Sequence, residues 1–143
     1  MGVQNIYVCS LVSAMCVVGC ADTVTSPCPV TQDRLTGQYQ LAMNEVEGGD
    51  CGGMGSLNVV IQHGVVVPDE RIGCELRAQD WEQDICTNHS VLECDDGEWK
   101  MTLAWMITGD PTFHDQISGE LHAEMDRWNG AYTCASTYTF EVD

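Results

Sequence analysis

The cysteines are the residues of this 143-residue chain best suited to covalent chemistry, and there are nine of them. Thiols form disulfides, bind metals or carry lipid, and their spacing helps to separate these roles. Zinc sites favour close pairs such as C-x₂-C, but the closest pair after residue 20 is Cys86 and Cys94, with seven residues between them. This spacing favours disulfides and argues against a metal site. The six cysteines concerned are Cys28, Cys51, Cys74, Cys86, Cys94 and Cys134.

The first twenty residues predict export. The residues from Ile6 to Val18 are uncharged and either apolar or small. This run is too short to span a bilayer as a helix, which takes ~20 residues. It is typical of the apolar middle of a signal peptide. The sequence Val17-Val18-Gly19-Cys20 that follows resembles the lipobox of bacterial lipoproteins. The resemblance implies that residues 1–19 are a cleaved signal peptide, that Cys20 carries diacylglycerol, and that an acyl chain such as palmitate blocks the new N-terminus.

One feature departs from that family's pattern, because no Lys or Arg precedes the apolar run. An ordinary cleaved signal or a buried core segment are the alternatives. In the enterobacterial sorting rule, Ala21 after the lipidated residue implies the outer membrane, so we expect a lipid-anchored protein of the cell envelope.

Lipidation of Cys20 would leave the six later cysteines, an even number, in an oxidising compartment where disulfides persist. Sequence alone does not decide how six cysteines pair. We favour Cys86–Cys94, closing a tight loop around Asn88-His89-Ser90. We also expect Cys28 to tie a flexible tether, residues 20–35, to the folded domain.

The charge limits the choice of partner. The chain has 22 acidic and five basic residues, which gives a formal net charge of −17, and all of these charged residues lie after Cys20. Such a surface excludes nucleic-acid binding and disfavours peripheral binding to anionic lipids. The acyl chains on Cys20 are then the expected contact with the membrane. The carboxylates are scattered, which favours a solubilising role. The densest run, Glu93–Glu98, predicts a turn rather than a calcium loop; weak calcium binding at the surface is the remaining metal hypothesis.

No motif predicts catalysis. No serine lies in a nucleophile-elbow context, and an even set of paired cysteines leaves no free thiol. His114 and His122 would share the wet side of a strand, ~26 Å apart at the rise of an extended chain, too far to share a metal. We therefore predict no catalytic residue, no metal ligand and no cofactor, and solvated surface histidines throughout (His63, His89, His114 and His122).

From Thr36 onward the apolar pattern has a period of two, which is typical of antiparallel strands with one wet face. Asp96-Gly97 and Asn129-Gly130 predict tight hairpin turns. We therefore expect one all-β domain over residues 36–143, a single antiparallel meander of about seven or eight strands that forms an up-and-down barrel or a β-sandwich. The strands expected are 132–142, 117–125 and 99–107, with weaker ones over 37–43, 56–62 and 72–79.

Thr36-Gly37-Gln38-Tyr39 is similar to the G-x-W opening of lipocalin barrels, with Tyr in place of Trp. The resemblance implies a barrel.

The four tryptophans divide into two pairs. Trp99 and Trp105 fall in an apolar row and are expected in the core. Trp81 and Trp128 fall at turn edges, where an exposed ring would mark a recognition surface. The leading hypothesis is a non-enzymatic envelope lipoprotein that binds a protein or has a structural role. The alternatives are a lipocalin-like carrier of a small apolar ligand and an envelope hydrolase without a recognisable motif.

Overall fold

The computed structural model describes residues 28, 30–47, 51–113, 115–130 and 132–143. The predicted signal peptide, Cys20 and the first part of the predicted tether lie outside this range, as does His114. A 3₁₀ turn, η1, precedes eight strands. Their bounds are η1 Gln32–Leu35, β1 Gly37–Glu47, β2 Gly55–Gln62, β3 Val65–Val67, β4 Gly73–Glu82, β5 Thr87–Asp95, β6 Trp99–Gly109, β7 Ile117–Arg127 and β8 Thr133–Val142.

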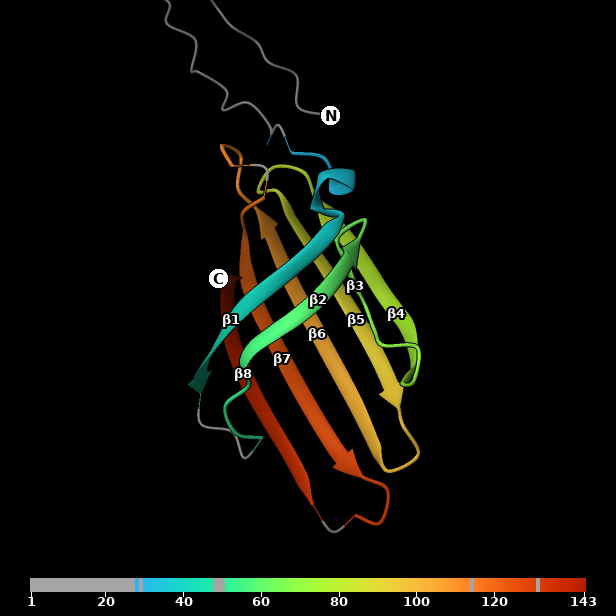
Figure 1. Ribbon diagram of the computed structural model, residues 1–143. Coiled ribbons are helices and arrows are strands. Elements are labelled where there is room, and N and C mark those ends of the chain that lie inside the picture. The colour runs from blue at the N-terminus through green and yellow to red at the C-terminus, as the bar shows by residue number, and fades with distance from the viewer. Residues whose placement is uncertain (1–27, 29, 48–50, 114, 131) are drawn as a thin grey trace, which may run out of the picture.

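The eight strands form one antiparallel sheet in the order β3-β2-β1-β8-β7-β6-β5-β4. Every chain neighbour is a sheet neighbour except β3 and β4, and the pairing of β1 with β8 joins the two ends of the chain. The sheet curls into a nearly closed barrel whose open seam lies between β3 and β4 (Figure 1). The prediction of an all-β antiparallel meander is confirmed, in its barrel form.

Alternation along the strands separates a packed interior from a wet exterior. In β8 the buried positions are every second residue from Cys134 to Phe140. Tyr138 is fully buried at the centre, and the ring of Phe140 meets that of Trp105 edge-on, with centroids 5.6 Å apart. Trp105 is therefore a core residue, as predicted, while Trp99 is half-buried. Large side chains fill the interior, including Leu41, Ile61, Ile107 and Leu121.

Glycines form the tight turns that the dipeptides predicted. Gly97, between β5 and β6, has φ +87°, and Gly130, between β7 and β8, has φ +66°. A side chain would be strained in this left-handed region. The run Glu93–Glu98 accordingly ends strand β5 and enters this turn, where Asp96 accepts hydrogen bonds from the backbone N–H groups of Glu98 and Trp99.

The six cysteines form three disulfides, Cys28–Cys86, Cys51–Cys134 and Cys74–Cys94. Cys28 ties the N-terminal segment to the domain, as predicted. The favoured pair Cys86–Cys94 is wrong, because the intervening residues form strand β5 rather than a loop. An extended chain of eight steps separates the two thiols by about 26 Å.

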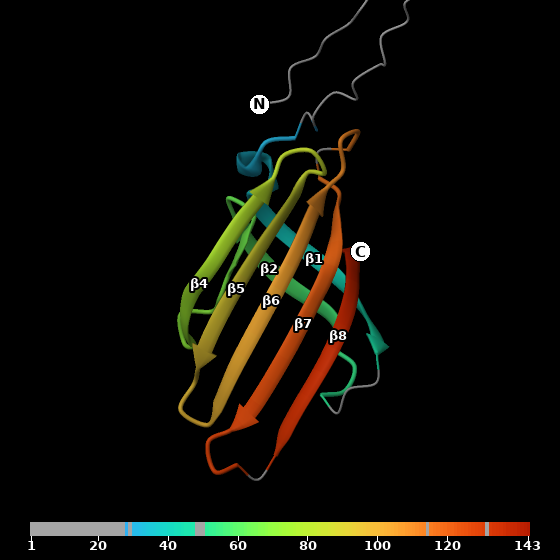
Figure 2. The same cartoon turned by 180° about the vertical axis from the view of Figure 1, so that it is seen from behind.

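Part of the predicted tether packs on the domain. Val30 and Leu35 are 2 % exposed and lie in the core cluster. The side-chain amide of Gln83 donates to the carbonyl oxygens of Cys28 and Val30. Cys28 and Val30–Leu35, which we name the strap, therefore cover one end of the barrel. The turns β5–β6 and β7–β8 lie at the opposite end (Figure 2). No helix within the described residues is long and apolar enough to cross a membrane.

Candidate binding face

The solvent side of strands β4–β8, which we name the outer face, gathers side chains from distant parts of the chain. Asp80 pairs with His89, His89 with Met106, and Met106 with Glu120, so the four form one row across four strands. In the next row, Ala78 lies opposite Val91, which pairs with Ala104, which in turn pairs with His122. Cross-strand neighbours on one face of a sheet lie within reach of each other. The register therefore assembles a surface that no single strand carries.

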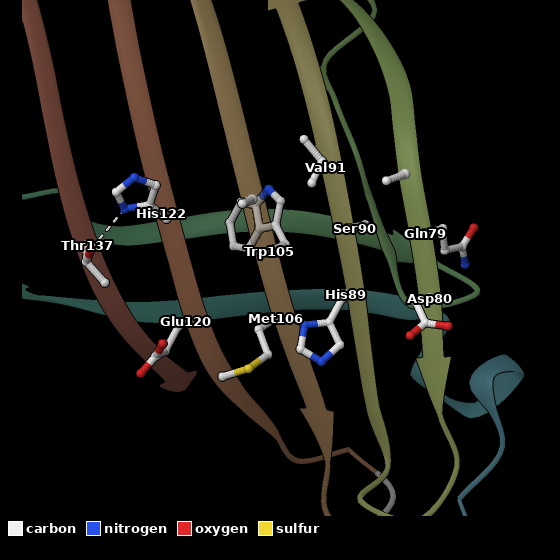
Figure 3. Close-up of a pocket in the computed structure, with 12 residues that line it drawn as sticks. Gln79, Asp80, His89, Ser90, Val91, Trp105, Met106, Glu120, His122 and Thr137 are labelled. Atoms are coloured by element: carbon white, nitrogen blue, oxygen red, sulfur yellow. Dashed lines mark hydrogen bonds between the residues drawn. The ribbon is translucent and has the colours of Figure 1, made fainter.

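The small residues of the second row leave a hollow of about 330 Å³, which we name the apolar hollow. Ala78, Val91 and Ala104 line it, and the longer side chains of His89, Met106, Glu120 and His122 surround it (Figure 3). Strands β1 and β2 pass behind the sheet in this view, so the hollow opens to the outside of the barrel and not into its interior.

Both histidines of the outer face contact polar partners. Nδ1 of His122 makes a 3.0 Å hydrogen bond with Oγ1 of Thr137, and its Nε2 lies 3.3 Å from Oε1 of Glu124. Nε2 of His89 lies 2.8 Å from Oε1 of Glu82. His122 is exposed at the surface, as predicted, whereas His89 is partly buried by its neighbours.

A second hollow of about 770 Å³, the acidic hollow, continues along the outer face toward the β5–β6 turn. Five carboxylates line it: Glu75, Glu93, Asp95, Glu124 and Asp126. Two basic side chains lie among them. Arg77 pairs with Glu75 at 2.8 Å and with Glu93 at 2.6 Å, while Lys100 stands in register between Asp95 and Asp126. Carboxylates thus outnumber cations in the lining.

Trp128 borders the acidic hollow and Trp81 does not. Trp128 is 54 % exposed, its Nε1 donates to Oδ1 of Asp95 at 3.0 Å, and Nζ of Lys100 lies 3.7 Å from the centroid of its ring. The Trp128 hydrogen bond, with that of the Gly97 backbone N–H, holds the pKa of Asp95 below its usual value. Trp81 packs against the core. Of the two predicted recognition tryptophans, only Trp128 presents a mainly exposed ring.

The arrangement is suited to ion pairing and hydrogen bonding rather than to covalent chemistry. All six cysteines after residue 20 lie in disulfides. Among the described residues, no three His, Cys, Asp or Glu side chains converge as ligands for a metal ion. The carboxylates of the β5–β6 turn instead accept hydrogen bonds from backbone N–H groups. No protein family, curated protein or solved structure matches the chain.

The outer face was not predicted from the sequence. The carboxylates were interpreted as scattered, because their sequence positions do not cluster. A signal was present in strand 117–125, where Glu120, His122 and Glu124 stand at every second position. The pairing of that strand with the outward residues of its neighbours was needed to find the surface.

Proposed function

We propose that this chain is a non-enzymatic binding module whose outer face holds a cationic segment of a partner protein. The observation that carries the proposal is the lining of the two adjacent hollows. Asp80 and Glu120 belong to the apolar hollow and five further carboxylates to the acidic hollow, against one arginine and one lysine. Complementary charge favours encounter with a basic partner and disfavours an acidic one.

The apolar hollow also suits a basic side chain. Lys and Arg carry long methylene stems that pack on apolar surface while their charged heads stay in water. Ala104, Val91 and Met106 offer such a surface, and Asp80 and Glu120 lie at its rim. A partner's basic side chain therefore finds both contacts in one place.

The carrier hypothesis asks for an interior cavity, and a small-molecule site has a volume of about 300 Å³ or more. The interior positions hold large side chains such as Tyr138 and Leu121, and the apolar hollow lies outside the barrel (Figure 3). These observations favour a surface that binds a partner over an interior that carries a ligand.

The lipid anchor is part of the proposal. Cys20 stands eight residues before Cys28, so an extended linker would reach about 26 Å from the membrane to the strap. The end that carries Trp128, opposite the strap, would then face away from the bilayer. Labelling with a palmitate analogue in a bacterial host tests this, since the label should be lost in Cys20→Ala; a variant that kept the label would exclude the anchor.

The binding proposal is tested with a ten-residue peptide in which Lys alternates with Val. The variant Glu75→Gln/Asp80→Asn/Glu82→Gln removes three charges from the outer face of β4. Each exposed ion pair contributes about 0.5 kcal/mol, so we expect about tenfold weaker binding.

The matched control, Asp84→Asn/Asp115→Asn/Asp143→Asn, removes the same charge from exposed turns and the C-terminus. It should change binding less than twofold. Equal losses in both variants would mean that only net charge matters, and the proposed face would then be wrong.

A further inference from the structure

Strand β4 is an edge of the barrel. It pairs with β5 over its length, from Gly73 to Glu82, and within the described part of the chain no strand pairs with its other side. On the far side of the seam β3 is only three residues long, Val65–Val67. The turn before β3 reaches past β4 to β5, where Nδ2 of Asn88 donates to the carbonyl oxygen of Gly64 at 2.8 Å. β4 contacts this turn through Gln79, whose side-chain amide donates a hydrogen bond to the carbonyl oxygen of His63.

The inner side of β4 is uncovered at Leu76. Leu76 lies in register with Leu92, but Leu76 is 47 % exposed whereas Leu92 is 3 % exposed. A large apolar side chain at an inward position normally packs against the opposite wall of the barrel. At Leu76 the described residues form no such wall, because the sheet ends at the seam between β3 and β4. A strand placed beside β4 would cover Leu76 and continue the sheet.

We propose that the cationic segment of the partner binds as an additional β-strand along the free edge of β4. Strand addition of this kind takes affinity from main-chain hydrogen bonds and specificity from alternate side chains. On the outer face, Glu75, Asp80 and Glu82 would meet Lys or Arg. On the inner side, an apolar residue would cover Leu76. The inference rests on the proposed function and adds the conformation and the pattern of the partner, extended with basic and apolar residues in alternation.

The charges on β4 argue against a second copy of this chain as the strand that pairs with its free edge. Exposed edges that carry charged side chains resist pairing with themselves. β4 carries Glu75, Asp80 and Glu82 against Arg77 alone, and each copy has a net charge of −17. Two such edges would place carboxylates against carboxylates. A basic segment reverses the sign of that interaction.

The register of β4 shifts between Leu76 and Ala78. Such a bulge interrupts regular pairing on its own strand. The longest regular stretch of the free edge is therefore Ala78–Glu82, so the added strand should pair most regularly there and continue past the bulge to Leu76.

Amide hydrogen exchange on the intact chain, with and without the Lys/Val peptide, tests the inference. In a strand, successive N–H groups point to opposite edges, so alternate amides within Ala78–Glu82 should exchange at least tenfold more slowly when the peptide is bound. Two further peptides carry backbone N-methyl groups on odd or on even residues, with side chains and charge unchanged. One of the two should bind at least tenfold more weakly than the parent.

The outcomes separate the two proposals. A peptide that binds in a charge-dependent way, leaves exchange in Ala78–Glu82 unchanged and tolerates both methylation patterns would overturn strand addition and leave the proposed function standing. A peptide that does not bind at all would overturn both.

Discussion

The side-chain amide of Asn88 donates to the carbonyl oxygen of Gly64 at 2.8 Å, and this hydrogen bond holds the β2–β3 turn against β5. Asn88 is fully buried. Its Oδ1 accepts hydrogen bonds from Gln32 of η1 and from Gln79 of β4. One side chain therefore joins the strap, the turn and both sides of the seam.

Replacing Asn88 by Ala should lower the free energy of unfolding by about 2 kcal/mol, because it leaves buried polar groups without partners. Asn58→Ala, at an exposed position of β2, is the matched control and should change stability by less than about 0.5 kcal/mol. Urea denaturation measures both. Equal stability of the two variants would mean that the Asn88 contacts do not hold the seam.

Gly119→Ala should destabilise the barrel strongly. A Cβ at Gly119 would overlap the carbonyl oxygen of Met106 and would lie 2.9 Å from the ring of Phe140, so strands β6 and β7 would have to separate. We expect a loss of about 3 kcal/mol or more. Gly130→Ala meets no neighbouring atom but has φ +66°, and should cost about 1 kcal/mol. Thermal unfolding distinguishes them, and the reverse order of stabilities would contradict the packing of β7.

The three disulfides should contribute unequally. The Cys28–Cys86 bond joins residues 58 apart in sequence, whereas Cys74–Cys94 joins residues 20 apart. Loop-closure entropy predicts that the double Cys→Ser variant of the first pair loses about 4 kcal/mol and that of the second about 1 kcal/mol less. Peptide mapping without reduction checks the pairing itself, and recovery of a peptide linked through Cys86 and Cys94 would contradict it.

The contact between Asp95 and Trp128 should depend on pH. The folded-state pKa of Asp95 is lowered from 3.8, mainly by the Trp128 hydrogen bond. The stability that this carboxylate contributes is therefore complete above its unfolded pKa and is lost as pH falls through the lower folded pKa. The indole N–H resonance of Trp128 should titrate with a midpoint below 3.8.

The indole of Trp81 provides an internal control, because it donates to the neutral side chain of Gln83. Its resonance should not follow the titration of Asp95. A Trp128 midpoint at or above 3.8, or a parallel change at Trp81, would show that the Asp95 contact is not what moves the resonance.

Strands with clean alternation could be predicted from sequence, and β6, β7 and β8 are the examples. β5 was missed because Asn88 and Ser90 occupy inward positions and interrupt the apolar pattern. That omission also led to the wrong disulfide, since the residues between Cys86 and Cys94 were assigned to a loop. The strap was assigned to the tether because four polar residues, Thr31–Arg34, separate its buried aliphatic residues, Val30 and Leu35.

The candidate site depends on relationships that sequence does not contain. Asp80, His89, Met106 and Glu120 come from four strands and become neighbours only through the register. The hollow beside them exists because Ala78 and Ala104 are small residues in the adjacent row, and neither residue is distinctive in the sequence.

The most direct test of the binding face is amide chemical-shift mapping by NMR while the Lys/Val peptide is added to the whole chain. We predict that the largest changes fall on β4 and on the outward residues of β5 and β6 beside it, around Asp80, His89 and Ala104, and that a Glu/Val peptide of the same length causes none. Changes centred on β1 and β2, or equal effects of the two peptides, would contradict the account.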